Sequence, residues 1–144
     1  MLLRTLKIRW AGLLVIAMMF GAGCRAKVVK VVYVIPSTFT GVCIIRSNMP
    51  NGSDILQENG AYKFVFPDNG EINLTGEDPT IGVLLDASAR DSSGKSLPFE
   101  GAVAVPPHTK GVFLESTDGQ GTVNLFVGTP EQRASHRINY RPKE

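Results

Sequence analysis

The chain has 144 residues, of which 43% are apolar and 19% are charged, with 15 glycines, 9 prolines and two cysteines. This composition excludes a disulfide-stapled mini-protein, a disordered acidic tail, a collagen and a polytopic membrane protein. The formal net charge of +2 comes from cations near the start, and residues 24–144 carry 12 basic against 13 acidic side chains. Since nucleic-acid binding depends on a basic surplus, we expect no nucleic-acid partner.

The first 23 residues have the pattern of an export signal. Residues 1–9 (MLLRTLKIR) are basic without an acid, residues 10–20 (WAGLLVIAMMF) are almost wholly apolar, and the small residues Gly21-Ala22-Gly23 follow. This order is typical of a signal peptide. The apolar run ends at Arg25 and is shorter than the roughly 20 residues that a membrane-spanning helix needs. We therefore predict a cleaved signal helix over residues 1–23.

Cys24 follows directly, and the segment Phe20-Gly21-Ala22-Gly23-Cys24 resembles the lipobox of bacterial lipoproteins. The resemblance implies that the Cys24 sulfur carries a diacylglycerol thioether and that Cys24 is the first residue of the mature protein. Gly21 departs from the family's pattern, which usually has Leu there. The alternative is an ordinary secretory signal in which Cys24 is incidental. Two or three acyl chains would anchor a small domain stably, so the predicted partner is the lipid bilayer.

Residues 24–27 then form a short lipidated tether to a single domain over residues 28–144. At about 3.4 Å per residue, this tether holds the domain within about 15–20 Å of the membrane. Arg25, Lys27 and Lys30 could add attraction to anionic headgroups, although a solvated strand start explains them equally well. In the lipoprotein family, Asp after the lipidated cysteine retains a protein in the inner membrane of Gram-negative cells. Arg25 instead permits the outer membrane, with the protein on its periplasmic face if the cell is Gram-negative.

The second cysteine, Cys43, lies within the apolar run Gly41-Val42-Cys43-Ile44-Ile45. An exported chain with two cysteines invites a Cys24–Cys43 disulfide, which lipidation of Cys24 would exclude. We expect Cys43 to be a small buried hydrophobe rather than a reactive thiol.

Short β-type runs separated by turn residues dominate the mature chain. In the first run Val29, Val31, Tyr33 and Ile35 share one face, which we expect to face the core. The predicted strands cover residues 28–35, 41–45, 62–66, 71–75, 80–86, 99–105, 110–116 and 121–128. About seven or eight short strands predict an all-β fold, as an antiparallel β-sandwich or a small barrel.

Turn residues give three further local predictions. Pro67-Asp68-Asn69-Gly70 predicts a hairpin that joins the strands at 62–66 and 71–75. Residues 48–59 are predicted to form a loop, with Asn51-Gly52 as its tight turn. Thr129-Pro130-Glu131-Gln132 is a capping box with proline at the first helical position, so it predicts one short C-terminal helix through about His136.

The segment Tyr33-Val34-Ile35-Pro36-Ser37-Thr38-Phe39-Thr40-Gly41 resembles the opening of a family of small uncharacterised domains in bacterial secreted proteins and lipoproteins. In that family a later aromatic strand ends in a Pro-x-x-Gly turn, as at 66–70 here. Phe126-Val127-Gly128-Thr129, before a short polar helix, is a weaker third match. The resemblance implies a β domain and brings no activity. We expect Pro36 to end a strand, Phe39 to fill the core and Gly41 to permit a special backbone angle or a close approach.

Residues 89–96 nearly spell a phosphate-binding loop. Ala89 replaces the leading glycine, however, and Pro98 interrupts the helix whose N-terminus should hold the phosphates. We therefore predict a polar hairpin loop and no nucleotide.

Other residues that carry chemistry give no site pattern. His108 and His136 lack the spacing of metal ligands, and the acid pair Glu77-Asp78 lies in a turn-like stretch, where solvation is expected before calcium binding or acid–base work. The acidic stretch 54–100 and the basic stretch 131–144 are expected to be two solvated faces. We predict no metal, no cofactor and no catalytic residue.

Three functions remain open. The favoured one is a membrane-anchored, non-enzymatic binding or envelope-structural module with an envelope protein as its possible partner. An envelope hydrolase could instead assemble a site from loop residues such as His108 and Asp86, and clustering of these side chains in one pocket would favour it. The third is an inhibitor or accessory subunit that acts through an exposed loop at 48–59.

Overall fold

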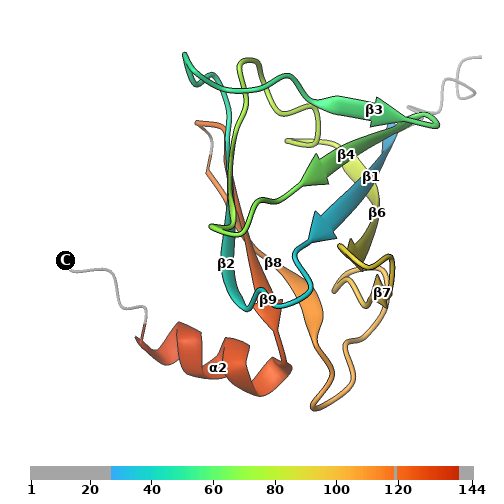
Figure 1. Cartoon of the computed structure of the whole chain (residues 1–144), viewed down its shortest axis with the longest axis vertical. Coiled ribbons are helices and arrows are strands. Elements are labelled where there is room, and N and C mark those ends of the chain that lie inside the picture. The colour runs from blue at the N-terminus through green and yellow to red at the C-terminus, as the bar shows by residue number, and fades with distance from the viewer. Residues whose placement is uncertain (1–26, 119, 140–144) are drawn as a thin grey trace, which may run out of the picture.

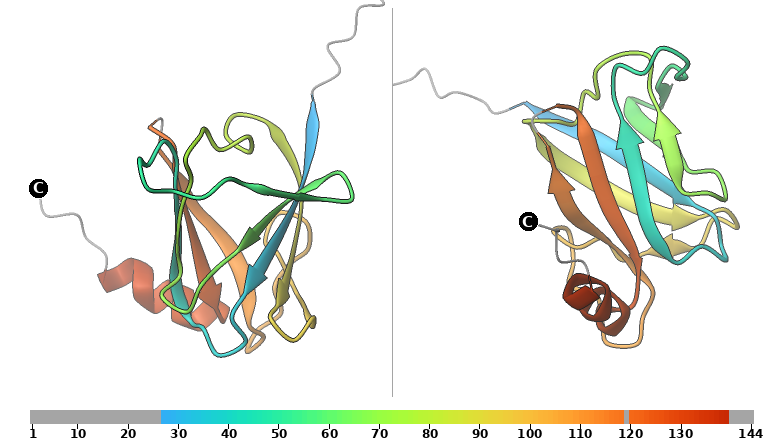
Figure 2. Two further views of the ribbon diagram at one scale, coloured as in Figure 1. Left: turned by 45° about the horizontal axis from the view of Figure 1, so that its top comes forward. Right: turned by 90° about the vertical axis from the view of Figure 1, so that its left-hand side faces the viewer.

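Two β-sheets packed against each other form the body of the protein in a computed structural model, which describes residues 27–118 and 120–139 (Figure 1). The elements in chain order are β1 Val28–Ile35, β2 Gly41–Arg46, β3 Leu56–Glu58, β4 Ala61–Val65, β5 Glu71–Asn73, β6 Leu84–Asp91, β7 Ser96–Leu97, β8 Gly111–Thr117, β9 Thr122–Gly128 and α2 Pro130–Asn139. The predicted all-β sandwich with one short C-terminal helix is confirmed, in place of the small barrel. Figure 2 shows the two sheets from two further directions.

The sheets are mixed, so the predicted antiparallel arrangement is wrong in part. The first sheet has the order β3-β4-β1-β6-β7, and its central strand β1 runs parallel to both β4 and β6. The second sheet has the order β5-β2-β9-β8, in which β5 is parallel to β2 while β9 is antiparallel to both of its neighbours. Parallel neighbours require crossover connections, and here these connections pass from one sheet to the other.

The core lies between the sheets and uses the face of β1 that the alternation predicted. Val29, Val31, Tyr33 and Ile35 are all at most 5% exposed. The Tyr33 ring stacks between Phe64 and Phe99, with ring centroids 5.5 Å apart on either side. An aromatic stack of this kind buries a large apolar area and fixes the orientations of the rings in the core.

The turn at 67–70 forms, but it does not make the predicted hairpin. The Gly70 N–H donates to the Pro67 carbonyl over 2.9 Å. The strands on either side, β4 and β5, belong to different sheets, because β4 pairs with β1 and β5 with β2. Turn chemistry reverses the chain locally and does not decide which strand the returning segment joins.

Gly70 packs against Phe39 and so brings together the segments 33–41 and 66–70, on which the family resemblance rests. It has a φ of 73°, and a Cβ placed there would lie 2.5 Å from the Phe39 ring. Gly41 has a φ of 133°, and a Cβ placed there would lie 4.0 Å from the same ring. Phe39 is half-buried and packs on the edge of the core, so it seals the core edge rather than filling its centre.

Two predicted strands are displaced or absent. The strand expected at 80–86 begins at Leu84 and runs to Asp91, because residues 79–83 form turns and bends. At 99–105 only Phe99 makes a bridge, to Val112, and the following residues turn back through bonds to the Phe99 carbonyl. Two very short strands, β3 and β7, went unpredicted since they have only three and two residues and lie at sheet edges.

The predicted capping box is confirmed at the start of α2. The Thr129 N–H donates to the Gln132 side chain over 2.9 Å, and the Gln132 N–H donates to the Thr129 hydroxyl over 3.3 Å. This exchange gives the backbone N–H groups of Thr129 and Gln132 hydrogen-bond acceptors, which the first turn of a helix otherwise lacks. The helix extends to Asn139, three residues beyond the predicted end. It lies at the end of the sandwich opposite the start of β1 (Figures 1 and 2).

Candidate functional site

The predicted lipidation residue, Cys24, lies outside the described residues, as does Tyr140 in the C-terminal tail. The described chain starts at Lys27, and β1 begins at the next residue. Within the described part, no helix is long and apolar enough to cross a membrane.

Cys43 is buried, as its apolar surroundings predicted. It is a free thiol on β2 with 0% exposure. Burial raises the pKa of Cys43 to about 12, while the nearby positive charge of Lys110 acts weakly in the opposite direction. A thiol with so little thiolate and no access to solvent is a packing residue.

The structure does not bring His108 and Asp86 together. The His108 side chain is 87% exposed, and its Nδ1 lies 3.3 Å from Glu131 at the start of α2. Asp86 is on β6 opposite Lys30, near the beginning of β1 and so at the other end of the domain (Figure 1). The hydrolase site considered from the sequence is therefore not assembled from these two side chains.

The segment that resembles a phosphate-binding loop is the hairpin between β6 and β7, as predicted. The Asp91 carboxylate accepts hydrogen bonds from the backbone N–H groups of Ser93 and Lys95 and from the Ser93 hydroxyl. These bonds lower the pKa of Asp91, the Ser93 hydroxyl most strongly. The backbone donors that would bind a phosphate are thus occupied by a carboxylate of the loop itself.

The loop predicted at 48–59 is held down along most of its length. Met49 and Ser53 donate backbone hydrogen bonds to Leu74 and Asn73, each over 2.8 Å. The Gly52 N–H donates to the Met49 carbonyl, which closes a four-residue turn with Pro50 at its second position. Part of this loop lies against the segment after β5 and part pairs as β3, although most residues of 48–59 are exposed.

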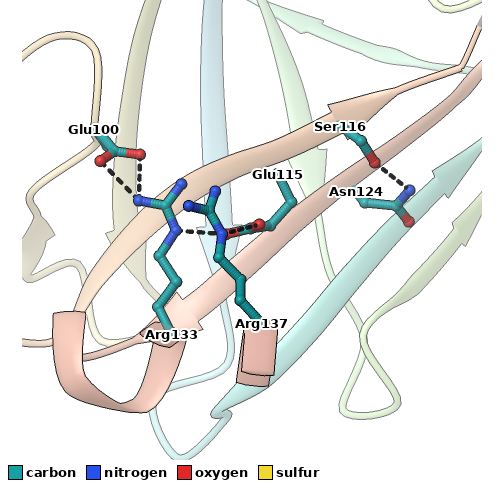
Figure 3. Close-up of polar contacts among 6 residues, drawn as sticks. All are labelled: Glu100, Glu115, Ser116, Asn124, Arg133 and Arg137. Atoms are coloured by element: carbon teal, nitrogen blue, oxygen red, sulfur yellow. Dashed lines mark hydrogen bonds and ion pairs between the residues drawn. The ribbon is translucent and has the colours of Figure 1, made fainter. Parts of the chain in front are cut away.

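The predicted solvated basic face is wrong for α2. Arg133 Nε lies 2.5 Å from a Glu115 oxygen and Arg133 Nη1 lies 2.6 Å from Glu100, while Arg137 Nε reaches the other Glu115 oxygen over 2.9 Å (Figure 3). The Arg133 side chain is only 13% exposed and its guanidinium lies 4.5 Å from the centre of the Phe113 ring. These contacts join the helix to β8.

Three members of this group, Glu100, Arg133 and Arg137, border a surface cavity of about 520 Å³ that also has apolar side chains in its lining. The charges cancel, and each guanidinium already faces a carboxylate. We therefore assign the group to helix docking rather than to binding of an anionic ligand.

A second cavity, of about 260 Å³, differs because its lining is acidic. It is formed by the loops after β2, before β6 and before β9, and its polar lining residues are Ser47, Asn48, Glu77, Asp78 and Gln120. Ser47 and Asp78 are both less than one-tenth exposed. The loops after β2 and before β6 lie at the end of the sandwich where β1 begins (Figure 2).

Asp78 was expected to be solvated, and this expectation is wrong. It is 5% exposed, and its Oδ1 accepts hydrogen bonds from the Thr80 N–H and hydroxyl, while its Oδ2 is buried without a hydrogen-bond partner. Together with burial, which is the larger effect, the Asp78 charge raises the pKa of Tyr33 in the core. The Asp-Pro-Thr spacing was the available signal, since a side chain that bonds two residues ahead makes a compact turn.

Exposed apolar side chains gather where β1 and β6 begin. Val28 and Leu84 are direct partners in the register of these strands, and each is 58% exposed. They lie on the outer face of the first sheet, at the point where the chain enters the domain.

No family model matches the chain, and no curated protein matches it. Among solved structures, the chain is similar to a crystal structure from Bacillus anthracis described as "Putative Lipoprotein". The two share 15% sequence identity with a TM-score of 0.47, and the match covers 82% of each chain. A likeness at this level carries no function over to the chain.

Proposed function

We propose that this protein is a lipid-anchored module of a bacterial cell envelope, which acts by binding or by structural contact rather than by catalysis. Acyl chains on Cys24 hold it at the membrane, on the periplasmic face of the outer membrane in a Gram-negative cell. The lipobox-like segment that ends at Cys24 supports the lipid anchor. The outer membrane is supported by Arg25, because the residue directly after the cysteine is not the Asp that retains lipoproteins in the inner membrane.

The observation that carries the proposal is the distance along the chain between Cys24 and the domain. β1 begins at Val28, four residues after Cys24, so at about 3.4 Å per residue the anchor is within roughly 14 Å of the first strand. This strand is the central one of the five-stranded sheet. A lipid on Cys24 would therefore fix the position of the whole domain and not that of a loose tail.

The anchor also gives the domain a direction. The end that carries the start of β1 would face the bilayer, and α2 lies at the opposite end (Figure 2). A protein partner in the envelope would therefore meet the end that carries α2 and the hairpin at 91–95. Support for a non-catalytic role comes from the separation of His108 from Asp86 and from the burial of Cys43.

The full chain expressed in a Gram-negative host tests the proposal. We expect the protein in the membrane fraction, with a mature N-terminus at Cys24 whose intact mass includes a diacylglycerol and an amide-linked acyl chain. The C24S variant should lose this mass and the processing at Cys24. The C43A variant is the matched control, because it removes the other cysteine and should be lipidated normally. An unmodified N-terminus in the wild type, or one at another residue, would overturn the proposal.

A further inference from the structure

Two exposed apolar side chains lie side by side where the chain enters the domain. Val28 on β1 and Leu84 on β6 are direct partners in the strand register, and each is 58% exposed. No large apolar side chain in the described part of the chain is more exposed than these two. Contact between apolar side chains and water is unfavourable, so a partner that covers this pair would gain free energy.

Leu84 is an exception to the pattern of its own strand. Along β6 the outward-facing positions that follow it are Asp86, Ser88 and Arg90, which are all exposed and polar. Its neighbour Leu85 points the other way and packs against the core. Strand alternation directs Leu84 away from the core, so packing inside the domain does not account for an apolar side chain at this position.

The position of the pair in the chain indicates what covers it. This step rests on the proposed lipid anchor, because Val28 lies four residues after Cys24. At about 3.4 Å per residue, the lipidated cysteine is within roughly 14 Å of Val28. A surface tethered this closely has a far higher effective concentration than a protein that diffuses freely. The favoured occupant is therefore the lipid surface itself.

Charged side chains around the pair add less to this contact than the apolar ones. Lys27 and Lys30 are exposed on either side of Val28 along the chain. Lys30, however, is the register partner of Asp86, whose opposite charge lies on the same outer face of the sheet. Attraction to anionic headgroups is therefore partly cancelled, and the apolar pair carries the contact.

We propose that Val28 and Leu84 insert into the interface of the same bilayer that holds the acyl chains on Cys24. Exposed apolar side chains enter the boundary between headgroups and acyl chains, where they leave water without crossing the membrane. Insertion adds a second attachment beside the covalent one. Because the pair spans two adjacent strands, β1 and β6, it fixes the tilt of the sheet, which a single point of attachment would leave free.

Tryptophan fluorescence of the protein, expressed as the full chain in a Gram-negative host and reconstituted into phosphatidylcholine vesicles, tests the insertion. The sequence has one tryptophan, Trp10, which processing at Cys24 removes, so an L84W variant reports from position 84 alone. We expect its emission to shift to shorter wavelength in the vesicles. Lipids with bromine atoms high in their acyl chains should quench it several-fold more than the control. Because the contact is apolar, added phosphatidylglycerol or NaCl should change this quenching little.

The matched control is V65W. Val65 lies on the same outer face and is 47% exposed, but it pairs with Val34 near the far end of β1. Its emission should stay at the wavelength of a water-exposed tryptophan, without quenching by brominated lipid. The V28W variant repeats the measurement on β1 and decides if L84W does not fold.

Intact mass and flotation with the vesicles separate the insertion from the anchor. A lipidated L84W variant that floats with the vesicles but is quenched no more than V65W would overturn the insertion and leave the anchor in place. Strong and equal quenching at positions 84 and 65 would also overturn it, because the whole sheet face would then lie on the bilayer. A protein without lipid at Cys24 would overturn the proposed function, and the insertion with it.

Discussion

Gly52 shows how a single residue can be required for a reason that its sequence context does not reveal. Asn51-Gly52 predicts a tight hairpin turn in which both residues have positive φ. Neither has a positive φ in the structure, and the turn runs from Met49 to Gly52 instead. Glycine is needed because the backbone of Leu74 and Thr75 lies directly against its Cα.

We expect the G52A variant to lose about 3 kcal/mol of unfolding free energy, the upper end of the range for overpacking. An added Cβ would lie 2.3 Å from the Leu74 carbonyl carbon and 2.6 Å from the Thr75 nitrogen. Backbone atoms cannot move aside as the end of a side chain can. Urea unfolding measures the loss.

The control for G52A is G76A. A Cβ at Gly76 meets no atom within 4 Å, and Gly76 does not have a positive φ, so its stability should change by less than about 0.5 kcal/mol. Equal stability of the two variants would show that the loop at 48–53 does not lie against the segment after β5.

Among the elements, α2 depends on Glu115 for its docking. The register between β8 and β9 shifts between Leu114 and Ser116, which leaves Glu115 without a partner across the strands. A bulge of this kind redirects a side chain, and Glu115 binds Arg133 and Arg137 of the helix (Figure 3). Burial acts to raise the pKa of Glu115, but the hydrogen bonds from the two arginines outweigh it and the pKa is lowered.

The E115Q variant should therefore be less stable than the wild type at pH 7, by about 1.5–3 kcal/mol, as for hydrogen bonds to charged groups. Because the pKa of Glu115 is lower in the folded state, its contribution is complete above the ordinary value of 4.5. It is lost as the pH falls through the folded-state pKa. The stability difference between the two proteins should stay constant from pH 7 to about pH 5.5 and shrink below pH 4.5.

The control for E115Q is E71Q, which removes the partner of Arg46 in an exposed ion pair. Solvent screens this pair, so E71Q should be the milder substitution at pH 7. If denaturation curves for E115Q and the wild type differ by the same amount at pH 3.5 as at pH 7, the ion pairs of Glu115 do not stabilise the helix.

The sequence predicted which segments become strands better than which strands pair. The buried face of β1, the two strands at 110–116 and 121–128 and the cap at Thr129 follow from local sequence patterns, and all three are confirmed. The parallel pairs of β1 with β4 and β6 depend on contacts about 30 and 55 residues apart, for which no local pattern exists. The burial of Asp78 was not predicted for the same reason, because the loops that cover it are remote from it in the sequence.

At the scale of the whole molecule, the position of Leu84 beside Val28 predicts how the domain lies on a membrane. If Cys24 is lipidated, Leu84 is near the bilayer, and the hairpin after β6 is about 23 Å further away, at roughly 3.3 Å for each of seven strand residues. Cys43 is buried, so it should not compete for labelling with a cysteine introduced at the surface.

A fluorophore on an L84C variant in liposomes should therefore be quenched by lipids that carry a quencher in their headgroup or upper acyl chain. The same fluorophore on a K95C variant, in the hairpin at the opposite end of β6, should keep its emission. Equal quenching at the two positions would mean that the domain has no fixed orientation on the bilayer.

The central place of β1 also determines when the protein can fold as it emerges from a ribosome or a translocation channel. Its partner β4 ends at Val65 and its partner β6 ends at Asp91, so roughly the first two-thirds of the chain must be released before β1 is paired on both sides. Until then a run of five valines, one tyrosine and one isoleucine around one lysine has open edges of the kind that initiate aggregation. A chaperone that holds nascent chains would therefore bind this segment until β6 emerges.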